Sequence, residues 1–515
     1  MTTESKKKWR KAGIIIGCIL AVFVVLFLIA DSIISHVADK QIRQVLAEKY
    51  DGYADYSRLR ISPWAGTVTV EDVAISSEDS MTLSKDKPGF ALRVGRIAVR
   101  NLDLLSLIRT QTLPLCKIKL KDVQAQVVSD KQNPYMEIAL GALEVHAHGV
   151  GYNLQDSTVV YNDSLYLLEL SDLHFMAPDS LTAIDLERFY TKNAGPLEMA
   201  GLHVYNTVDR RELAVRKGNI PGTWADMNLD EIVTSPVNVI RMALAQQVAI
   251  DSVRVVSHQG GAIFRDARFK PKEPYPMPQE VIRACPIPLS IGNVAVDVDK
   301  LDIEIATTHV NSGNLSLADT KVEIKDASNK RGAAIRCIIH DARIGKSRSS
   351  GSMIMHLDKN CNFETKVLVR GFELSYMDSL LCPLVGFTAN AEVDTLRAHI
   401  FGDSERSHGD FCMIYHDFSV KVHKDENIPY HFITKNAGFV ESFANTMLPK
   451  SNPPAHATAP RAYKVEWKRD VMSPFPLYMF GPIIDGAVKT MLPGLFVHDK
   501  IKENKNNKPA KNQKK

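Results

Sequence analysis

The middle of the chain is dominated by short runs in which apolar and polar residues alternate. A period of two predicts β-strands with one buried and one solvated face, because successive side chains of a strand point to opposite sides. Turn-forming residues such as 87–89 and 311–313 separate the runs. Short strands joined by frequent turns predict an antiparallel sheet. The clearest runs are 67–70, 96–99, 293–298, 301–305, 315–317, 321–324, 335–339 and 353–357.

The N-terminal region predicts a membrane anchor. Residues 12–30 carry no charged side chain, and as a helix they would cover about 28 Å, close to the thickness of the hydrocarbon core of a bilayer. Five basic residues within 6–11 predict that the N-terminus is cytoplasmic and the rest lies across the membrane. A cleaved signal peptide is the alternative, but its apolar region is shorter and ends at a small-residue site. The anchor residues that we single out are Ile14, Leu20, Phe23, Leu26 and Phe27.

Two stretches interrupt the strand pattern. A short helix is expected within 229–255, and the six prolines of 270–288 predict an extended connector, since proline is unsuited to central strands. The expected organisation is a cytoplasmic basic segment at 1–11, the transmembrane anchor at 12–30, a juxtamembrane helix at 31–50, an N-terminal β half at 51–270, a Pro-rich connector at 271–288, a C-terminal β half at 289–470, an amphipathic helical segment at 471–496 and a Lys-rich disordered tail at 497–515.

Motifs for catalysis and metal binding are scarce. The chain has no Walker loop, no G-x-S-x-G elbow and no C-x-x-C pair. Glu144, His146 and His148 would share one face of a strand and form the best metal candidate, although a polar outer face explains them better. The seven cysteines have no disulfide-framework spacing, so mostly free, buried thiols are expected, with one bridge left open. We expect no enzyme activity, no metal and no cofactor.

The composition of the chain limits the classes of partner that it is expected to bind. Hydrophobic residues make up 45% of the chain and charged residues 24%, which is ordinary for a globular protein. The net charge of +4 is too small for the basic surface of a nucleic-acid-binding protein, so no nucleic-acid partner is expected. Seven lysines and one acid from residue 500 onward could contact anionic lipid after the apolar helix, or form a solubilising tail.

Several segments resemble the AsmA-like family, the single-anchored, β-rich envelope proteins of Gram-negative bacteria. The resemblance begins with the anchor and the segment 60–73, which has the sequence RISPWAGTVTVEDV. It continues at 286–291 (PIPLSI), 396–403 (LRAHIFGD) and 409–418 (GDFCMIYHDF), and it ends at 467–470 (WKRD) before an aromatic helix. It covers most of 12–495 in patches, and the family has no defined catalytic residues to carry over.

The resemblance implies a mainly β fold. In this fold an N-terminal transmembrane helix precedes an elongated, twisted antiparallel sheet of taco or groove shape, with a few short helices and a C-terminal amphipathic helix. It also implies an inner-membrane-anchored periplasmic protein that binds phospholipid or another envelope lipid in support of outer-membrane biogenesis, with outer-membrane or periplasmic proteins as further partners. The lipid-groove candidates are Val68, Val70, Ile97, Val99, Val294, Val296, Val298, Leu315, Leu317, Val322 and Ile324.

Two alternatives stay open. The first is a structural or adaptor protein of the envelope, whose sheet is packed shut around a filled core. The second is an anchored enzyme that acts on glycans or lipids, for which Glu144, His146 and His148 are the residues to test.

Overall fold

The computed structural model describes most of the chain between residues 52 and 491. The described ranges are 39, 43–44, 52–62, 65–83, 88–103, 112–128, 136–153, 158–160, 162–177, 181–209, 212, 223–266, 273–306, 312–385, 387–423, 438, 441–442, 445–446 and 448–491. The anchor residues Ile14, Leu20, Phe23, Leu26 and Phe27, most of the helix expected at 31–50, and the tail at 497–515 lie outside these ranges. Within them, no helix combines the length and the apolar character that crossing a membrane requires.

The protein is mainly β, and most of its strands pair antiparallel, as the alternating runs predicted. The chain divides into two compact units. Unit 1 comprises 1–202 and 236–241, and unit 2 comprises 203–235 and 242–515. The Pro-rich connector at 271–288 therefore lies inside unit 2.

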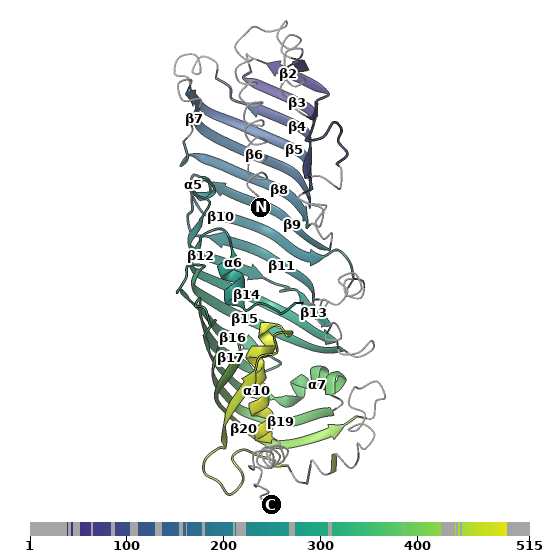
Figure 1. The fold of residues 1–515 in the computed structure, drawn as a ribbon, viewed down its shortest axis with the longest axis vertical. Coiled ribbons are helices and arrows are strands. Elements are labelled where there is room, and N and C mark those ends of the chain that lie inside the picture. Colours follow the sequence, from purple (N-terminus) through teal and green to yellow (C-terminus); the bar gives the residue numbers. More distant parts are fainter. Residues whose placement is uncertain are drawn as a thin grey trace, which may run out of the picture. The chain divides into compact units, whose positions relative to one another are not determined.

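Unit 1 is a meander of antiparallel strands. Both β1 and β2 pair with β3, which starts the sequential pairing β3–β4–β5–β6–β8–β9. These strands lie side by side in the purple and blue part of Figure 1. The strands are β1 (Tyr53–Asp55), β2 (Arg58–Ser62), β3 (Thr67–Ser76), β4 (Gly89–Arg100), β5 (Thr112–Val128), β6 (Met136–Asn153), β7 (Thr158–Val160), β8 (Tyr166–Met176), β9 (Thr182–Lys192) and β10 (Leu197–Asn206), of which β10 ends in unit 2.

Unit 2 contains a crossover between β13 and β14 and continues as a second meander from β14 to β21. Its strands are β11 (Thr223–Thr234), β12 (Val248–Ser257), β13 (Ala262–Asp266), β14 (Leu289–Ala306), β15 (Ser312–Ser328), β16 (Ala334–Arg343), β17 (Arg348–His356), β18 (Phe363–Glu373), β19 (Phe387–Gly402), β20 (Arg406–Val422) and β21 (Ala462–Lys468). The helical elements are α5 (Val239–Ala245), which begins in unit 1, α6 (Pro278–Ala284), the 3₁₀ helix η2 (Leu374–Met377), α7 (Asp378–Val385) and α10 (Phe475–Met491).

The Pro-rich segment serves as this crossover. Both β12 and β13 run parallel to β14, and a parallel neighbour requires a connection that returns the chain to the same end of the sheet. The expectation of a wholly extended connector was wrong for part of the segment, because α6 forms at 278–284. Pro278 stands in the first turn of α6, where its missing N–H leaves no hydrogen bond unmade.

Two other expectations need correction. The segment 229–255 is mostly strand, and its helix is confined to α5, between β11 and β12. The runs 293–298 and 301–305 belong to one long strand, β14, and 315–317 and 321–324 belong to β15. The amphipathic helix expected within 471–496 is present as α10.

Candidate functional site

One face of the unit 1 sheet is lined by apolar side chains that lie opposite one another from strand to strand. In the first row, Val70 faces Ile97, Ile97 faces Leu120, and the row continues through Leu143 and Leu170 to Phe189 on β9. A second row, next to the first, consists of Val68, Val99, Ile118, Val145 and Leu168. The first row crosses six strands, which at the usual strand spacing corresponds to about 24 Å.

A line of aspartates and glycines crosses the same strands. At this line, the alternation of side chains between the two faces of the sheet shifts by one residue. Asp72, Asp122 and Asp172 have φ values of 54°, 53° and 55°, in the left-handed region that aspartate tolerates better than most residues. The pairing places Gly95 between Asp72 and Asp122, and Gly141 between Asp122 and Asp172. We call these five residues the crease.

At the crease, the alternation of side chains along each strand shifts by one residue. The apolar residues before and after the crease therefore point to the same face of the sheet. Beyond the crease, the partners Val73, Val94, Val123, Leu140, Leu173 and Leu186 form a third row. Val73 packs against the cluster that contains Val68 and Val70, although strict alternation from Val70 would send it to the other face. We call the three rows together the apolar face of unit 1.

The crease is closely packed around Gly141. A Cβ atom at this position would lie 2.7 Å from Oδ2 and 2.9 Å from Cβ of Asp172. Glycine is therefore required by the approach of the neighbouring left-handed aspartate, whose own Cβ occupies the space that a side chain would need.

The opposite face of unit 1 carries most of the charged side chains, apart from a small buried cluster that contains Ala91 and Val128. Lys119 Nζ lies 2.8 Å from Glu144, Arg188 Nε lies 3.0 Å from Glu169, and the His174 ring lies 2.5 Å from Asp185. Hydrogen bonds from Lys119 and then His146 lower the pKa of the Glu144 carboxyl. The charged side chains of this face contact water and form ion pairs with one another. The apolar face is therefore the side of the sheet that is suited to an apolar ligand.

The apolar face is only partly covered. At the β2–β5 end, Val68 and Val70 are buried with Tyr56, Leu102 and Cys116, and Ile97 and Val99 pack against them. Farther along, Leu120, Leu143 and Leu170 keep part of their surface exposed, whereas Leu140 and Leu186 of the third row are buried. In the described part of the chain, the helices with extensive contacts on strands are α7, on β15 and β19, and α10, on β20 and β21. No described helix of this kind lies over β4–β9.

Unit 2 repeats the arrangement on β12, β14, β15 and β16. Two rows of directly opposed residues are Val253, Val294, Ile324 and Cys337, and Val255, Val296, Val322 and Ile339. Val298 follows on β14, opposite Thr320. Asp319 and Asp326 have φ values of 47° and 58°, and Gly292 lies opposite Asp326. Leu315 and Leu317 lie beyond Asp319, opposite Ile303 and Leu301.

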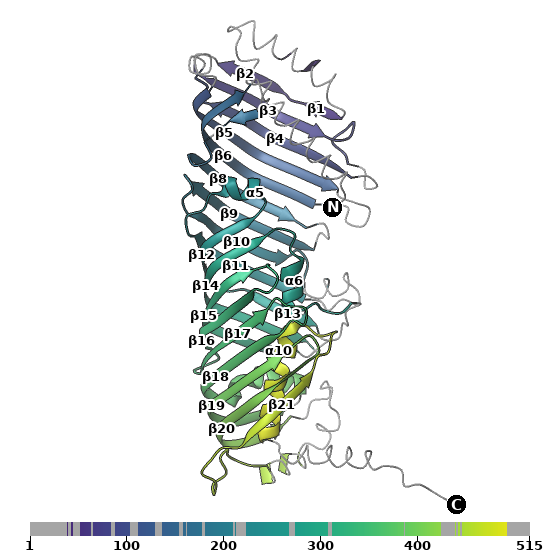
Figure 2. The same ribbon diagram turned by 60° about the vertical axis from the view of Figure 1, so that its left-hand side comes forward.

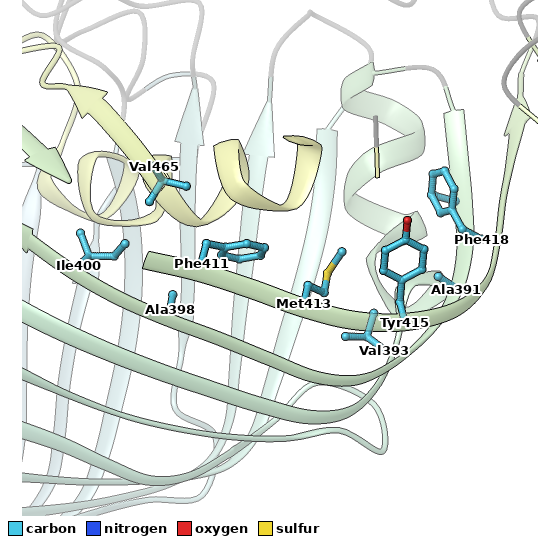
Figure 3. Close-up of a cluster of buried hydrophobic side chains, with 10 residues drawn as sticks. Ala391, Val393, Ala398, Ile400, Phe411, Met413, Tyr415, Phe418 and Val465 are labelled. Atoms are coloured by element: carbon cyan, nitrogen blue, oxygen red, sulfur yellow. The ribbon is translucent and has the colours of Figure 1, made fainter. Parts of the chain in front are cut away.

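The far end of unit 2 is filled by α10. In Figure 3, Phe411, Met413 and Tyr415 project from β20 toward the side on which α10 and Val465 of β21 lie. Ile483, Ala487 and Met491 of α10 pack against this cluster. A side chain at Gly486 would collide with the Phe411 ring, so this glycine allows the close approach of α10 to β20. Figure 2 shows α10 alongside β21.

The metal candidate is not assembled into a ligand set. Glu144 is bound to Lys119 and His146, and its face of the sheet is the charged one. Among the described residues, no group of three histidines, cysteines or acids is placed to hold a metal ion. The six described cysteines are free: Cys116 and Cys361 are buried and Cys285 is exposed.

Sequence reasoning missed the crease and therefore most of the face in unit 1. The eleven predicted groove residues fall into two separate groups, on β3–β4 and on β14–β15. Leu120, Leu143, Leu170 and Phe189 connect β4 to β9 and were not singled out. The available signal was the change of apolar positions from even to odd numbers at Asp122 and Asp172.

Neither the protein-family models nor the curated proteins include a match to this chain.

Proposed function

We propose that the chain is an inner-membrane-anchored periplasmic protein that binds lipid acyl chains along the apolar face of its sheet. In this proposal it supports outer-membrane biogenesis in the manner of the AsmA-like proteins that it resembles. The observation that carries the proposal is the continuous apolar face of unit 1, from Val70 to Phe189, which no described helix covers.

The chemistry of the face favours acyl chains as the ligand. Its rows from β3 to β8 consist of aliphatic side chains, which gain free energy when they leave water and form no hydrogen bonds. An acyl chain has no polar groups to satisfy along its length. One leaflet of a bilayer core is about 15 Å thick, so a face of about 24 Å accommodates a whole chain.

Photocrosslinking on the two faces of β6 tests the proposal. A photoreactive amino acid replaces Leu143 on the apolar face or its neighbour Ala142 on the charged face, in the full-length protein in phospholipid nanodiscs. We expect crosslinks from position 143 to phospholipid and far fewer from position 142. Equal crosslinking from both positions, or none from position 143, contradicts the proposal.

A charge on the face gives a second readout. Leu143→Asp should lower the amount of phospholipid that co-purifies with the protein, and Ala142→Asp is the matched control. The same contrast applies in unit 2 between Val294→Asp and Ala295→Asp. Circular dichroism separates a loss of lipid from a loss of fold, and unchanged lipid in a folded Leu143→Asp variant argues against this face.

A structural or adaptor role is the second candidate, and α10 is the observation that favours it. In unit 2, Ile483, Ala487 and Met491 of α10 cover the apolar side of β19–β21, which makes this end a filled core. A protein that is filled throughout would give no lipid crosslinks from position 143, so the same experiment separates the two functions.

A further inference from the structure

Helix α10 buries part of its apolar surface against the sheet and exposes the rest. Phe475 and Tyr478 belong to one core cluster, and Ile483 packs against another. By contrast, Leu477, Phe480 and Ile484 are 40%, 45% and 54% exposed. These three residues, spaced i, i+3 and i+7, form one stripe in the first part of α10, which we call the outer stripe. The next residues at this spacing, Ala487 and Met491, pack against the sheet.

The orientation of α10 keeps the outer stripe in solvent. Gly481 packs against the Trp467 ring and Gly486 against Phe411, so the helix approaches β20 and β21 closely through its two glycines. The Tyr478 hydroxyl donates a hydrogen bond to the Asp403 carbonyl, 3.1 Å away. The helix cannot turn the outer stripe inward without breaking these contacts.

A surface helix of a soluble protein normally presents charged residues to water, and the outer stripe presents none. The charged pair of α10, Lys489 and Asp485, is largely withdrawn from solvent, with side chains 27% and 13% exposed and 2.6 Å apart. The exposed side of α10 therefore has the composition of a surface that is buried against a second apolar partner.

The chemistry of the chain after α10 identifies this partner. Residues 500–515 contain seven lysines and one acid, Glu503. An apolar stripe followed by a lysine-rich segment is suited to a bilayer that has anionic headgroups, because the stripe enters the interface and the lysines meet the headgroup charge. With 17 residues and the charged pair Asp485 and Lys489, α10 does not combine the length and the apolar character that crossing a membrane requires.

We propose that the outer stripe of α10 docks α10 on an anionic lipid surface, in addition to the anchor expected at 12–30. The contact is peripheral and salt-sensitive, since part of it is electrostatic. It is independent of acyl-chain binding by the apolar face, because α10 already fills its own part of the sheet.

A fluorophore that senses polarity tests the docking. The full-length protein is held in nanodiscs of phosphatidylcholine, with the fluorophore at position 480 or, as control, at the exposed position 244 of α5. Vesicles of equal parts phosphatidylglycerol and phosphatidylcholine are then added. We expect a blue shift at position 480 that high salt weakens, and none at position 244 or with pure phosphatidylcholine vesicles.

Capture of the same vesicles by the nanodisc-held protein gives the second measurement. The variant L477S/F480S/I484S should bind the anionic vesicles roughly tenfold more weakly or worse. The control L244S/V281S, which removes two other exposed apolar side chains, should bind normally. Wild-type capture by the triple variant, or no blue shift at position 480, overturns the proposal.

Two further outcomes are informative. Self-association of the wild-type protein that the triple variant abolishes would assign the outer stripe to a second copy and overturn lipid docking. If the Leu143→Asp variant no longer loads lipid but still captures vesicles, the result would support docking by α10. Acyl-chain binding by the apolar face is tested separately, by the crosslinks from position 143.

Discussion

At the scale of single residues, the charged face of unit 1 contains an unfavourable arrangement. Arg96 lies directly opposite Lys121, and Arg100 lies directly opposite Lys117. Like charges that face each other across two strands destabilise a sheet. By contrast, Lys119 lies opposite Glu144 and is bound to it.

These neighbours on β5 provide a matched pair of variants. Lys121→Glu places an acid opposite Arg96 and should stabilise the protein by about 0.2–1 kcal/mol. Lys119→Glu removes the ion pair, sets two acids against each other and should destabilise the protein by a similar amount. Chemical denaturation of the full chain measures both, and equal effects of the two variants would contradict the assigned register.

At the scale of elements, the crease explains which strands the sequence predicted well. Period-two alternation identified the strands around 67–70 and 96–99, because each run lies on one side of the crease. In β14 the apolar residues occupy even positions from Val294 to Val298 and odd positions from Leu301 onward. In the sequence, this shift resembles the end of one strand and the start of another. The strand in fact continues, since Asp319 on the adjacent strand takes up the left-handed conformation opposite Asp299.

The sequence did not allow the pairing of distant strands to be predicted. Val70 meets Ile97 and then Leu120 only because their strands are in register, and no local pattern specifies that register. The short helix expected within 229–255 is present, but it is limited to α5 for a related reason. Ile232 and Val255 lie opposite each other on β11 and β12, and this cross-strand pairing prevails over the local helical spacing.

The close approach of Gly141 and Asp172 gives an element-scale prediction. Gly141→Ala should destabilise the protein by about 1–3 kcal/mol, since the new Cβ would collide with Asp172. Asp172→Gly should be nearly neutral alone, because glycine adopts the same left-handed backbone. In the double variant the loss should largely disappear, as a thermodynamic cycle by urea denaturation can measure. Simple additivity of the two changes would contradict the contact.

At the scale of the whole molecule, the described core is divided between the two units. The clusters of unit 1 contain five and three buried residues, and those of unit 2 contain ten and eight. Each of these clusters lies within a single unit. Unit 1 is therefore expected to open at a lower denaturant concentration than unit 2.

Two buried thiols report on the units separately. Burial raises the pKa of the Cys116 thiol in unit 1 to about 11, and burial also raises the pKa of Cys361 in unit 2. At pH 8 both remain protonated and react slowly with alkylating reagents until their cluster opens. Along a urea titration, mass spectrometry should detect alkylation of the exposed Cys285 first, then of Cys116, and of Cys361 last. Simultaneous labelling of Cys116 and Cys361 would show that the units unfold together.

The crease also bears on how a sheet of this kind can change in length. Each strand from β3 to β8 brings its own residue to the crease, whether aspartate or glycine, so the switch of parity is encoded locally in every hairpin. A duplicated or deleted hairpin would carry its aspartate and glycine with it and leave the neighbouring rows aligned. The apolar face can therefore grow or shrink in steps of one hairpin, about 10 Å each, without redesign of the rest.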